Sequence, residues 1–426
     1  MNAVSIGVDV GTTTIKAVLI DAESEAVLAC GRAATPWRQV VTGREMVPQE
    51  LYEAVSLAVA RTLAQTESRD VAGIGIASFG QSGTVVDASG ATLVNFVSWD
   101  DSRFTALGAQ LETEVGREHF AGLTGLAPAG CWSVNHVAGL SSTTRAVPGA
   151  TWLGVADWVA FMLCGARSAE FSLASESGLL DVTSGVWAPD LVTWAGIDAE
   201  FMPPLAASGT RIGRVPRGPL VGAAVTIAGH DHAVGSFGAH ATDHATLYDS
   251  AGTSETMVRR TVTVKPVPVE LVLNHGLQVG QHVIAGQRVT TSQRSSWALG
   301  AVLEALDPHR PRRNGPIKRP AKVGGVMSGK PTWAKGASPS AVWQGAMEAV
   351  ADDIAESARQ LDLYCGPHER TVIAGGWSAD PQFVDARARR LRVVSVSDVM
   401  EPGAVGAALA GAVAGQARPN TWLRSD

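Results

Sequence analysis

One stretch near the start of the chain combines two apolar runs with a polar turn. Residues 6–21 read Ile-Gly-Val-Asp-Val-Gly-Thr-Thr-Thr-Ile-Lys-Ala-Val-Leu-Ile-Asp. Apolar runs on either side of a tight turn predict a β-hairpin. Gly11 lets the backbone approach a bound group closely, and the turn N–H groups, threonine hydroxyls and Lys16 can converge on an anion. Asp9, at the mouth of the turn, can hold the divalent cation that accompanies a nucleotide. The stretch predicts a phosphate-binding hairpin, with an ordinary polar-turned hairpin as the alternative.

A second copy of this design lies in the other half of the chain. Residues 247–258 again place a strand and an aspartate before Gly252 and Thr253, and a return strand follows. Two such hairpins, about 240 residues apart, indicate two similar lobes that face one nucleotide. This arrangement resembles the superfamily of ATP-binding folds that includes actin, hexokinase and Hsp70.

Length and composition favour two globular domains. The chain has 426 residues, of which 46% are hydrophobic and 17% charged, so it can build large cores. A net charge of −6 argues against nucleic acid or an anionic membrane as the main partner. Four widely spaced cysteines, no leader segment and no membrane-length apolar run lead us to expect a cytoplasmic protein.

Strands and helices are expected to alternate in both halves, which predicts an α/β fold. Strands are expected at residues 71–77, 221–228 and 372–374, and helices at 49–65, 156–165, 341–363 and 401–415. We place the domain boundary after residue 230, which gives an N-terminal domain of residues 1–230 and a C-terminal domain of residues 231–426.

The order of further motifs resembles the FGGY carbohydrate kinases, over nearly the whole chain. The matching pieces are residues 9–16, 99–103, 157–165, 172–177, 229–231, 252–254, 375–376 and 401–408. The resemblance implies two ribonuclease H-like lobes of the actin-like ATPase type, with the catalytic cleft between them. It also implies Mg²⁺-ATP as the phosphoryl donor.

The resemblance implies that Asp231 is the general base. A sugar hydroxyl is a poor nucleophile, and a carboxylate within hydrogen-bond reach can accept its proton as it attacks phosphorus. Asp231 follows the expected interdomain strand, within Gly-His-Asp-His at residues 229–232. The alternative role is the N-cap of a helix that starts at Ala233, and both roles are compatible.

The nucleotide residues are also assigned by the resemblance. They are Thr12, Thr13, Lys16, Gly252 and Thr253 at the phosphates, Gly375, Gly376 and Asp380 near the adenosine, and Asp9 and Asp231 at the metal. A plain strand-to-helix turn is the alternative for the glycine pair.

The expected sugar pocket pairs hydrogen-bonding side chains with an aromatic face. Its members are Gln81, Ser82, Trp99, Asp100, Arg103, Asp231 and His232. A core tryptophan with a surface salt bridge is the alternative for residues 99–103, and Arg103 can instead orient Asp100. Metal binding by His230 and His232 is disfavoured, because adjacent residues chelate poorly.

Three departures from the family pattern leave the substrate open. His136 stands where relatives have a lysine, the chain is short around residues 308–335, and the Gln81-Ser82 pair matches neither glycerol kinases nor xylulokinases.

The sequence therefore predicts a phosphotransferase with an alcohol group as acceptor, acting on a small sugar or polyol, with a ketopentose favoured. A catalytically degenerate regulatory protein that binds nucleotide and sugar, and a hydrolase that uses Asp231 to activate water, are the alternatives. The oligomeric state stays open, and a homodimer is one option.

Overall fold

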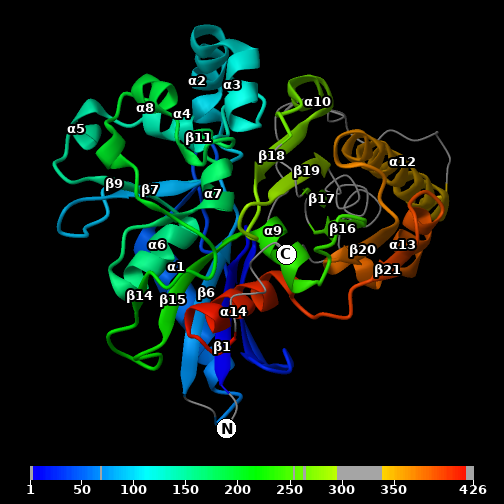
Figure 1. Cartoon of the computed structure of the whole chain (residues 1–426), viewed down its shortest axis with the longest axis horizontal. Helices are drawn as coiled ribbons and strands as arrows, with labels where there is room; N and C mark the ends of the chain where they lie inside the picture. The colour runs from blue at the N-terminus through cyan, green and yellow to red at the C-terminus, as the bar shows by residue number, and fades with distance from the viewer. Residues whose placement is uncertain (1–2, 68–69, 253–254, 262–264, 295–337, 419–426) are drawn as a thin grey trace.

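The computed structural model describes residues 3–67, 70–252, 255–261, 265–294 and 338–418. Two six-stranded sheets organise these residues into two lobes (Figure 1). The expected α/β architecture is present in both.

The first sheet is built around the first predicted hairpin. Its strands are β1 (Val4–Val10), β2 (Thr14–Asp21), β3 (Val27–Ala34), β6 (Val71–Ser78), β14 (Gly213–Arg214) and β15 (Ala224–His230), in the order β14-β15-β6-β1-β2-β3. β1, β2 and β3 pair antiparallel, whereas β6 and β15 run parallel to β1. β1 is buried along its whole length, as its apolar sequence predicts.

The second sheet repeats this plan. Its strands are β16 (Thr246–Ala251), β17 (Glu255–Thr261), β18 (Leu277–Gln281), β19 (Arg288–Arg294), β20 (Arg370–Ala374) and β21 (Val394–Val396), in the order β18-β19-β17-β16-β20-β21. The hairpin β16–β17 is antiparallel, and β20 and β21 extend the sheet in parallel. The internal duplication predicted from the two hairpins is therefore present in the sheet topology.

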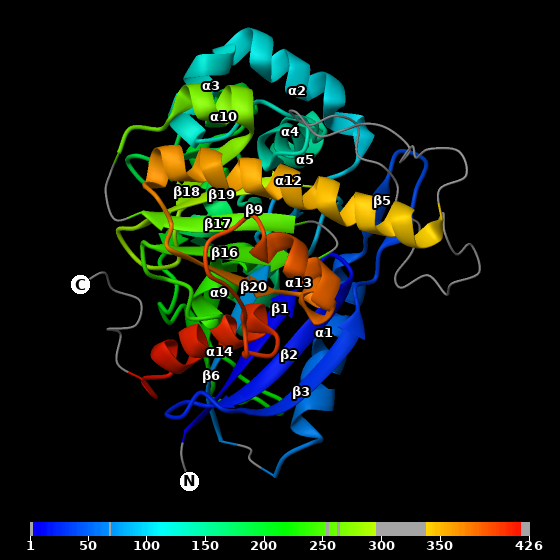
Figure 2. The same cartoon turned by 90° about the vertical axis from the view of Figure 1, so that its right-hand side faces the viewer.

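Helices cover the sheets on both sides. α1 (Pro48–Leu63) and α6 (Val155–Cys164) share the apolar core on one face of the first sheet. α9 (Asp231–Gly238) and α14 (Pro402–Ala414) lie on the other face, toward the second lobe (Figure 1). α12 (Pro339–Cys365) and α13 (Pro381–Ala388) pack on the second sheet (Figure 2). α9 and α14 contact each other, so they form the junction of the lobes.

α14 shows why the expected small-residue helix is built from glycine and alanine. It lies directly on β1 and β6, where a Cβ added to Gly7 would meet the Ala404 carbonyl oxygen at 1.8 Å. A Cβ added to Gly75 would meet the Ala407 carbonyl oxygen at 1.9 Å. Glycine in the strands and alanine in the helix thus permit a close backbone approach across the lobe junction.

The chain between β6 and β15 adds a helical region with its own core around Phe120, Trp132 and Leu191. Its helices are α2 (Thr105–Leu111), α3 (Arg117–Thr124), α4 (Ser133–Ala138), α5 (Ser142–Arg145), α7 (Phe171–Ser175) and α8 (Pro189–Trp194). Short strands pair as β7 (Gly83–Val86) with β9 (Thr151–Gly154), β10 (Ala169–Glu170) with β13 (Leu205–Ala206), and β11 (Leu180–Asp181) with β12 (Val186–Trp187). A further sheet contains β4 (Arg38–Gln39), β5 (Arg44–Met46) and β8 (Phe96–Val97).

This helical region also contacts the second lobe. α10 (Val269–His275) packs on α3, and the Val279 N–H of β18 donates to the Gly125 carbonyl at 2.9 Å. The Arg117 guanidinium donates to the Leu273 carbonyl at 2.9 Å. The two lobes therefore contact each other here as well as at α9 and α14.

One strand boundary differs from the sequence expectation. β15 begins at Ala224 rather than at residue 221, because Val221 lies in a turn in which its N–H donates to the Gly218 carbonyl. Gly218 and Gly222 have positive φ angles, which end any extended run there. The proposed boundary after residue 230 falls between β15 and α9, and α9 contacts strands of both sheets.

The expected shortening around residues 308–335 lies outside the described residues. All four cysteines lie within them, and each is a free thiol. Within the described ranges, no helix combines the length and apolar character that a membrane span requires.

Candidate active site

Asp231 lies at the junction of the lobes, as the first residue of α9. The N-cap position belongs to His230, so the expected N-cap role of Asp231 for a helix starting at residue 233 is wrong. The helix starts earlier because the chain turns directly from β15 into it. The Asp231 carboxylate accepts a hydrogen bond from the His232 N–H at 2.7 Å, and its charge is favourable at a helix N-terminus.

A buried hydrogen-bonded pair holds the backbone just before Asp231. The Ser172 hydroxyl donates to Glu170 at 2.5 Å and accepts the His230 N–H at 2.8 Å. Gly229 rests on this pair with φ +127°, and a Cβ there would lie 2.6 Å from Ser172 Oγ. Burial raises the pKa of Glu170 to about 8, although its bonds to Ser172 and Leu173 oppose the rise. Glu170 and Ser172 thus fix the path by which the chain enters α9.

The first hairpin brings Asp9 and Lys16 together on adjacent strands. Lys16 Nζ lies 3.5 Å from Asp9 and 3.0 Å from Glu401, which precedes α14. Burial raises the pKa of Asp9 to about 6 against the opposing charge of Lys16, and the charge of Asp231 contributes to the rise. Burial lowers the pKa of Lys16, but Asp9 and Glu401 outweigh it and raise the pKa overall. Lys16 is therefore a cation whose position beside the turn is fixed by the carboxylates of Asp9 and Glu401.

Backbone hydrogen bonds fix the turn of the first hairpin, which contains Thr12 and Thr13. The Thr12 carbonyl accepts from the Trp37 indole N–H at 2.8 Å, and the Thr13 carbonyl accepts from the Thr35 N–H at 3.1 Å. Both threonine side chains are half-buried. These two hydrogen bonds fix the backbone of the turn to residues 35–37.

The second hairpin has the same strand pairing as the first, but its aspartate, Asp249, lies on the other face of the strand from the one that packs on α9. Asp249 is fully buried, and its raised pKa follows from burial and from the nearby Glu255 carboxylate, opposed by Arg387. Arg387, on α13, bonds Glu255 at 2.7 Å. Since neighbouring strand residues face opposite sides, Asp249 points toward α13, away from the face that packs on α9. Asp249 is therefore no counterpart of Asp9.

Sequence reasoning missed Tyr248, which lies on the side of β16 that packs on α9. Its ring packs against Gly235 of α9, and its hydroxyl would lie 3.0 Å from a Cβ there. Burial raises the pKa of Tyr248, and the charges of Asp249, Asp9 and Asp231 raise it further. Gly252 lies in the turn that follows β16, whereas Thr253 lies outside the described residues.

Residues 375–380 occupy the turn after β20. Gly375 has φ +105°, and a Cβ would lie 2.4 Å from the Ala251 carbonyl oxygen, so only glycine fits beside the second hairpin. No described atom lies within 4 Å of a Cβ built on Gly376. Asp380 caps α13 by accepting the Gln382 N–H at 2.9 Å.

The loop after β6 places Gln81 and Ser82 in different surroundings. Gln81 has a positive φ of 66°, and its amide donates to Glu176 Oε2 at 2.7 Å. Glu176, which sequence reasoning missed, lies 95 residues further along the chain. The Ser82 hydroxyl is buried and donates to the Val97 carbonyl at 2.7 Å. The Gln81 side chain thus contacts the carboxylate of Glu176, whereas the Ser82 side chain is bonded to β8.

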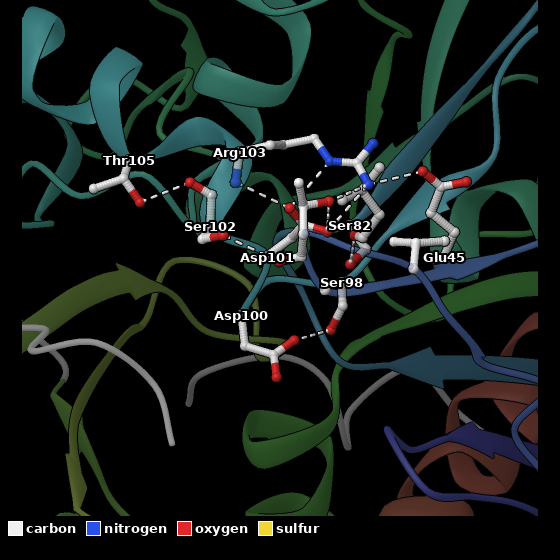
Figure 3. A network of polar contacts seen from close by, with 12 residues as sticks. Glu45, Ser82, Ser98, Asp100, Asp101, Ser102, Arg103 and Thr105 are labelled. Atoms are coloured by element: carbon white, nitrogen blue, oxygen red, sulfur yellow. Dashed lines mark hydrogen bonds and ion pairs between the residues drawn. The ribbon is translucent and has the colours of Figure 1, made fainter. Parts of the chain in front are cut away.

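Asp100 and Arg103 have different polar partners: Asp100 bonds to Ser98, whereas Arg103 contacts Asp101 and Glu45 (Figure 3). Arg103 contacts Asp101 at 3.0 Å and Glu45 at 2.8 Å. Arg44 instead binds both carboxylate oxygens of Asp100 at 3.0 Å. The suggestion that Arg103 orients Asp100 is therefore wrong, because a partner from β5 takes that place. Trp99, one residue earlier, is partly buried and packs against the core of the first lobe.

Of the two histidines named from the sequence, His136 is buried and His232 is half-buried. His232 Nε2 lies 3.1 Å from the Thr256 hydroxyl of β17, and burial lowers its pKa despite the charge of Asp231. His136 stacks on Phe104 with ring centroids 4.2 Å apart, and burial lowers its pKa to about 3. His136 is thus neutral and cannot replace a lysine charge.

The site fits a cation that is held mainly by phosphate oxygens. Asp9 Oδ1 is buried and has no hydrogen-bond partner in the described part of the chain. Within the same residues, no group of three acidic, histidine or cysteine side chains could enclose a metal by itself. One or two carboxylates together with phosphate oxygens is the usual environment of Mg²⁺.

Comparison with curated proteins finds relatives of low identity. L-Fuculokinase of Escherichia coli (strain K12) is 25% identical over 272 residues, which cover 60% of this chain and 56% of that protein. Xylulose kinase of Bacillus subtilis (strain 168) is 24% identical over 264 residues, covering 58% of this chain and 52% of that protein. The matched part spans about half the length of these curated relatives.

Solved structures match almost the whole chain. Xylulose kinase from Rhodospirillum rubrum superposes with a TM-score of 0.78 at 20% identity, covering 97% of this chain and 90% of that one. Glycerol kinase from Plasmodium falciparum with ADP gives a TM-score of 0.79 at 15% identity, covering 100% of this chain and 93% of that one. These similarities confirm the expected fold of two actin-like ATPase lobes.

The N-terminal domain of the FGGY family of carbohydrate kinases matches residues 4–238. This range includes the first hairpin, the Gln81 loop and Asp231, and it covers more than half of the chain. The resemblance inferred from the motif order is confirmed: the chain belongs to the FGGY family of carbohydrate kinases.

Proposed function

We propose that the chain transfers the γ-phosphoryl group of ATP to a hydroxyl group of a small sugar or polyol. The names of the matched relatives, which include L-fuculokinase, glycerol kinase, xylulose kinase and gluconokinase, support this acceptor class. A ketopentose remains the acceptor that we favour. The observation that carries the proposal is the position of Asp231 at the start of α9, which contacts strands of both sheets, where its charge acts on Asp9 of the first hairpin.

Asp231 is the proposed general base. The acceptor hydroxyl gives its proton to this carboxylate as its oxygen attacks the γ-phosphorus, and ADP leaves. The backbone before Asp231 is held by Ser172, and His232 links α9 to β17. The base is therefore positioned between the lobes before any substrate arrives, which limits the reorganisation needed for the reaction.

The two hairpins are the proposed phosphate-binding loops. Thr12, Thr13 and Lys16 contact phosphate from the first lobe, and Gly252 and Thr253 do so from the second. Mg²⁺, held by phosphate oxygens with Asp9 and Asp231, would neutralise charge on the transferring group. When phosphate enters, Lys16 can exchange one of its carboxylate partners for a phosphate oxygen.

The remaining assignments divide the chain into two functional parts. Residues 1–230 form the proposed domain that holds the first hairpin and the sugar site, with Gln81, Ser82, Trp99, Asp100 and Arg103 as its candidate residues. Residues 231–426 form the proposed domain that holds the second hairpin and the adenosine site, with Gly375, Gly376 and Asp380. Since Ser82 and Arg103 are tied to Val97 and Asp101, we expect them to shape the sugar site more than to contact substrate.

The substitution Asp231→Asn tests the base. It keeps the side-chain shape and an oxygen that can accept the His232 N–H, so the fold and ATP affinity should persist. The rate of acceptor-stimulated ADP release should fall by roughly 10²- to 10⁴-fold. Asp198→Asn, at an exposed position of the first lobe, is the matched control and should leave this rate unchanged. If Asp231→Asn keeps more than about a tenth of the wild-type kcat, Asp231 is not the base.

A further inference from the structure

A second buried carboxylate lies beside the proposed base and has no role in the mechanism above. Glu176 follows α7, and its side chain accepts the Gln81 amide at 2.7 Å. A Cβ added to Gly80 would lie 2.8 Å from Glu176 Cβ and 3.1 Å from the His230 ring. Glu176, Gln81 and His230 therefore surround the same glycine, next to Asp231.

The charges of this group are coupled across the site. Burial raises the pKa of Glu176, His230 and the Gln81 bond lower it, and the charge of Asp231 raises it again. The Glu176 carboxylate thus responds to the charge of the proposed base. Two carboxylates therefore lie close enough together at the proposed acceptor site for their charges to interact.

The two arginines around the candidate sugar residues have other carboxylate partners than Glu176. Arg44 is paired with Asp100, and Arg103 is paired with Asp101 and Glu45. In the part of the chain that the structure describes, no lysine or arginine forms an ion pair with Glu176. The surroundings of the proposed acceptor position are therefore acidic, whereas Lys16 lies beside the first hairpin.

We propose that Glu176 is a specificity-determining residue that selects uncharged sugars and polyols and rejects acceptors that carry a carboxylate, such as aldonates. The inference rests on the proposed kinase function. A substrate hydroxyl can donate a charge-assisted hydrogen bond to Glu176, whereas a substrate carboxylate can donate none and is repelled. The positive φ of Gln81 is consistent with this role, because strained backbone is characteristic of ligand-binding positions.

Matched acceptor pairs provide the test. D-Glucitol and D-gluconate, xylitol and D-xylonate, and D-fructose and 2-keto-D-gluconate differ within each pair only by a terminal CH₂OH in place of a carboxylate. In wild type, the kcat/KM for ADP release should be at least about 100-fold higher for the uncharged member of an accepted pair. This is the size expected when a substrate carboxylate is placed next to the buried like charge of Glu176. Glu176→Gln keeps a bond with Gln81 but removes the charge, so it should narrow that ratio at least about tenfold.

Glu118→Gln is the matched control, because Glu118 is an exposed glutamate on α3. It should leave the ratio unchanged. Thermal unfolding verifies that both variants are folded, and calorimetric titration of D-glucitol and D-gluconate measures the same preference without turnover.

The outcomes separate the two proposals. A wild-type preference for the carboxylate member, or an unchanged ratio in Glu176→Gln, overturns the specificity role while the kinase function stands. If no acceptor in the set stimulates ADP release, the proposed function fails for these acceptors. The calorimetric preference then decides the specificity role: tighter binding of D-glucitol than of D-gluconate, reduced by Glu176→Gln, supports it, and any other result overturns it.

Discussion

Ser172 offers a sharp test of how the fold positions the proposed base. Ser172→Ala removes the hydroxyl that donates to Glu170 at 2.5 Å and accepts the His230 N–H at 2.8 Å. Glu170 keeps the backbone N–H groups of Ser172 and Leu173 as partners, but the His230 N–H loses its own. A buried donor without a partner costs about 1–3 kcal/mol, so the free energy of unfolding should fall by that amount.

The fall in kcat of Ser172→Ala should be larger than its loss of stability alone would cause. Because the lost bond fixes the residue before Asp231, the base can shift, and a displacement near 1 Å costs up to about 100-fold in rate. We expect kcat to fall by about 10- to 100-fold in a coupled ADP-release assay, with the KM for ATP little changed. Ser172→Thr keeps the hydroxyl and should retain most of the activity.

Ser177→Ala is the matched control for this prediction. The Ser177 hydroxyl is also buried, donates to the Ala174 carbonyl at 2.5 Å and accepts the Leu179 N–H at 3.0 Å. Its loss should lower the free energy of unfolding by a similar amount without lowering kcat. Equal kcat values for Ser172→Ala and Ser177→Ala would refute the positioning role of Ser172.

Two further predictions concern the nucleotide and the sugar. Burial raises the pKa of Asp9 from 3.8 to about 6, so the folded state binds this proton more tightly and the free energy of unfolding falls as pH rises between these values. Asp9→Asn should therefore raise the free energy of unfolding of the apo-protein by up to about 3 kcal/mol at pH 7.5 but little at pH 3.5, and it should abolish ATP use. Urea unfolding at both pH values measures the stability change. A variant less stable than wild type at pH 7.5 would contradict the prediction. Trp99→Ala should weaken sugar binding and erode a positive ATP–sugar coupling of about 1–3 kcal/mol, measured by calorimetry with a non-hydrolysable ATP analogue. Unchanged sugar affinity would place Trp99 in the core alone.

Local pattern predicted the elements that build this fold. The two hairpins, α1, α6, α12 and α14 all appear where apolar periodicity, turn residues and small residues predicted them. These features are local, because a turn or an amphipathic face is encoded within a few neighbouring residues. The pairing of the lobes followed from the repeat of one local design.

The partners of the site residues could not be predicted in the same way. Gln81 meets Glu176 across 95 residues, and Arg44 rather than Arg103 meets Asp100 across 56. Such contacts depend on how distant segments pack, which no short motif encodes. Asp249 was misread as a repeat of Asp9, because a shift of one residue along a strand reverses the face on which a side chain lies.

The most direct test of the central claim follows the γ-phosphoryl group itself. With [γ-³²P]ATP, Mg²⁺ and an accepted sugar or polyol, wild type should transfer the label to the acceptor in equal amount to the ADP formed, and Asp231→Asn should form almost no labelled product. Label that appears as inorganic phosphate regardless of acceptor would indicate a hydrolase and contradict the account. Tight nucleotide and sugar binding with no ADP formed by wild type would contradict it as well.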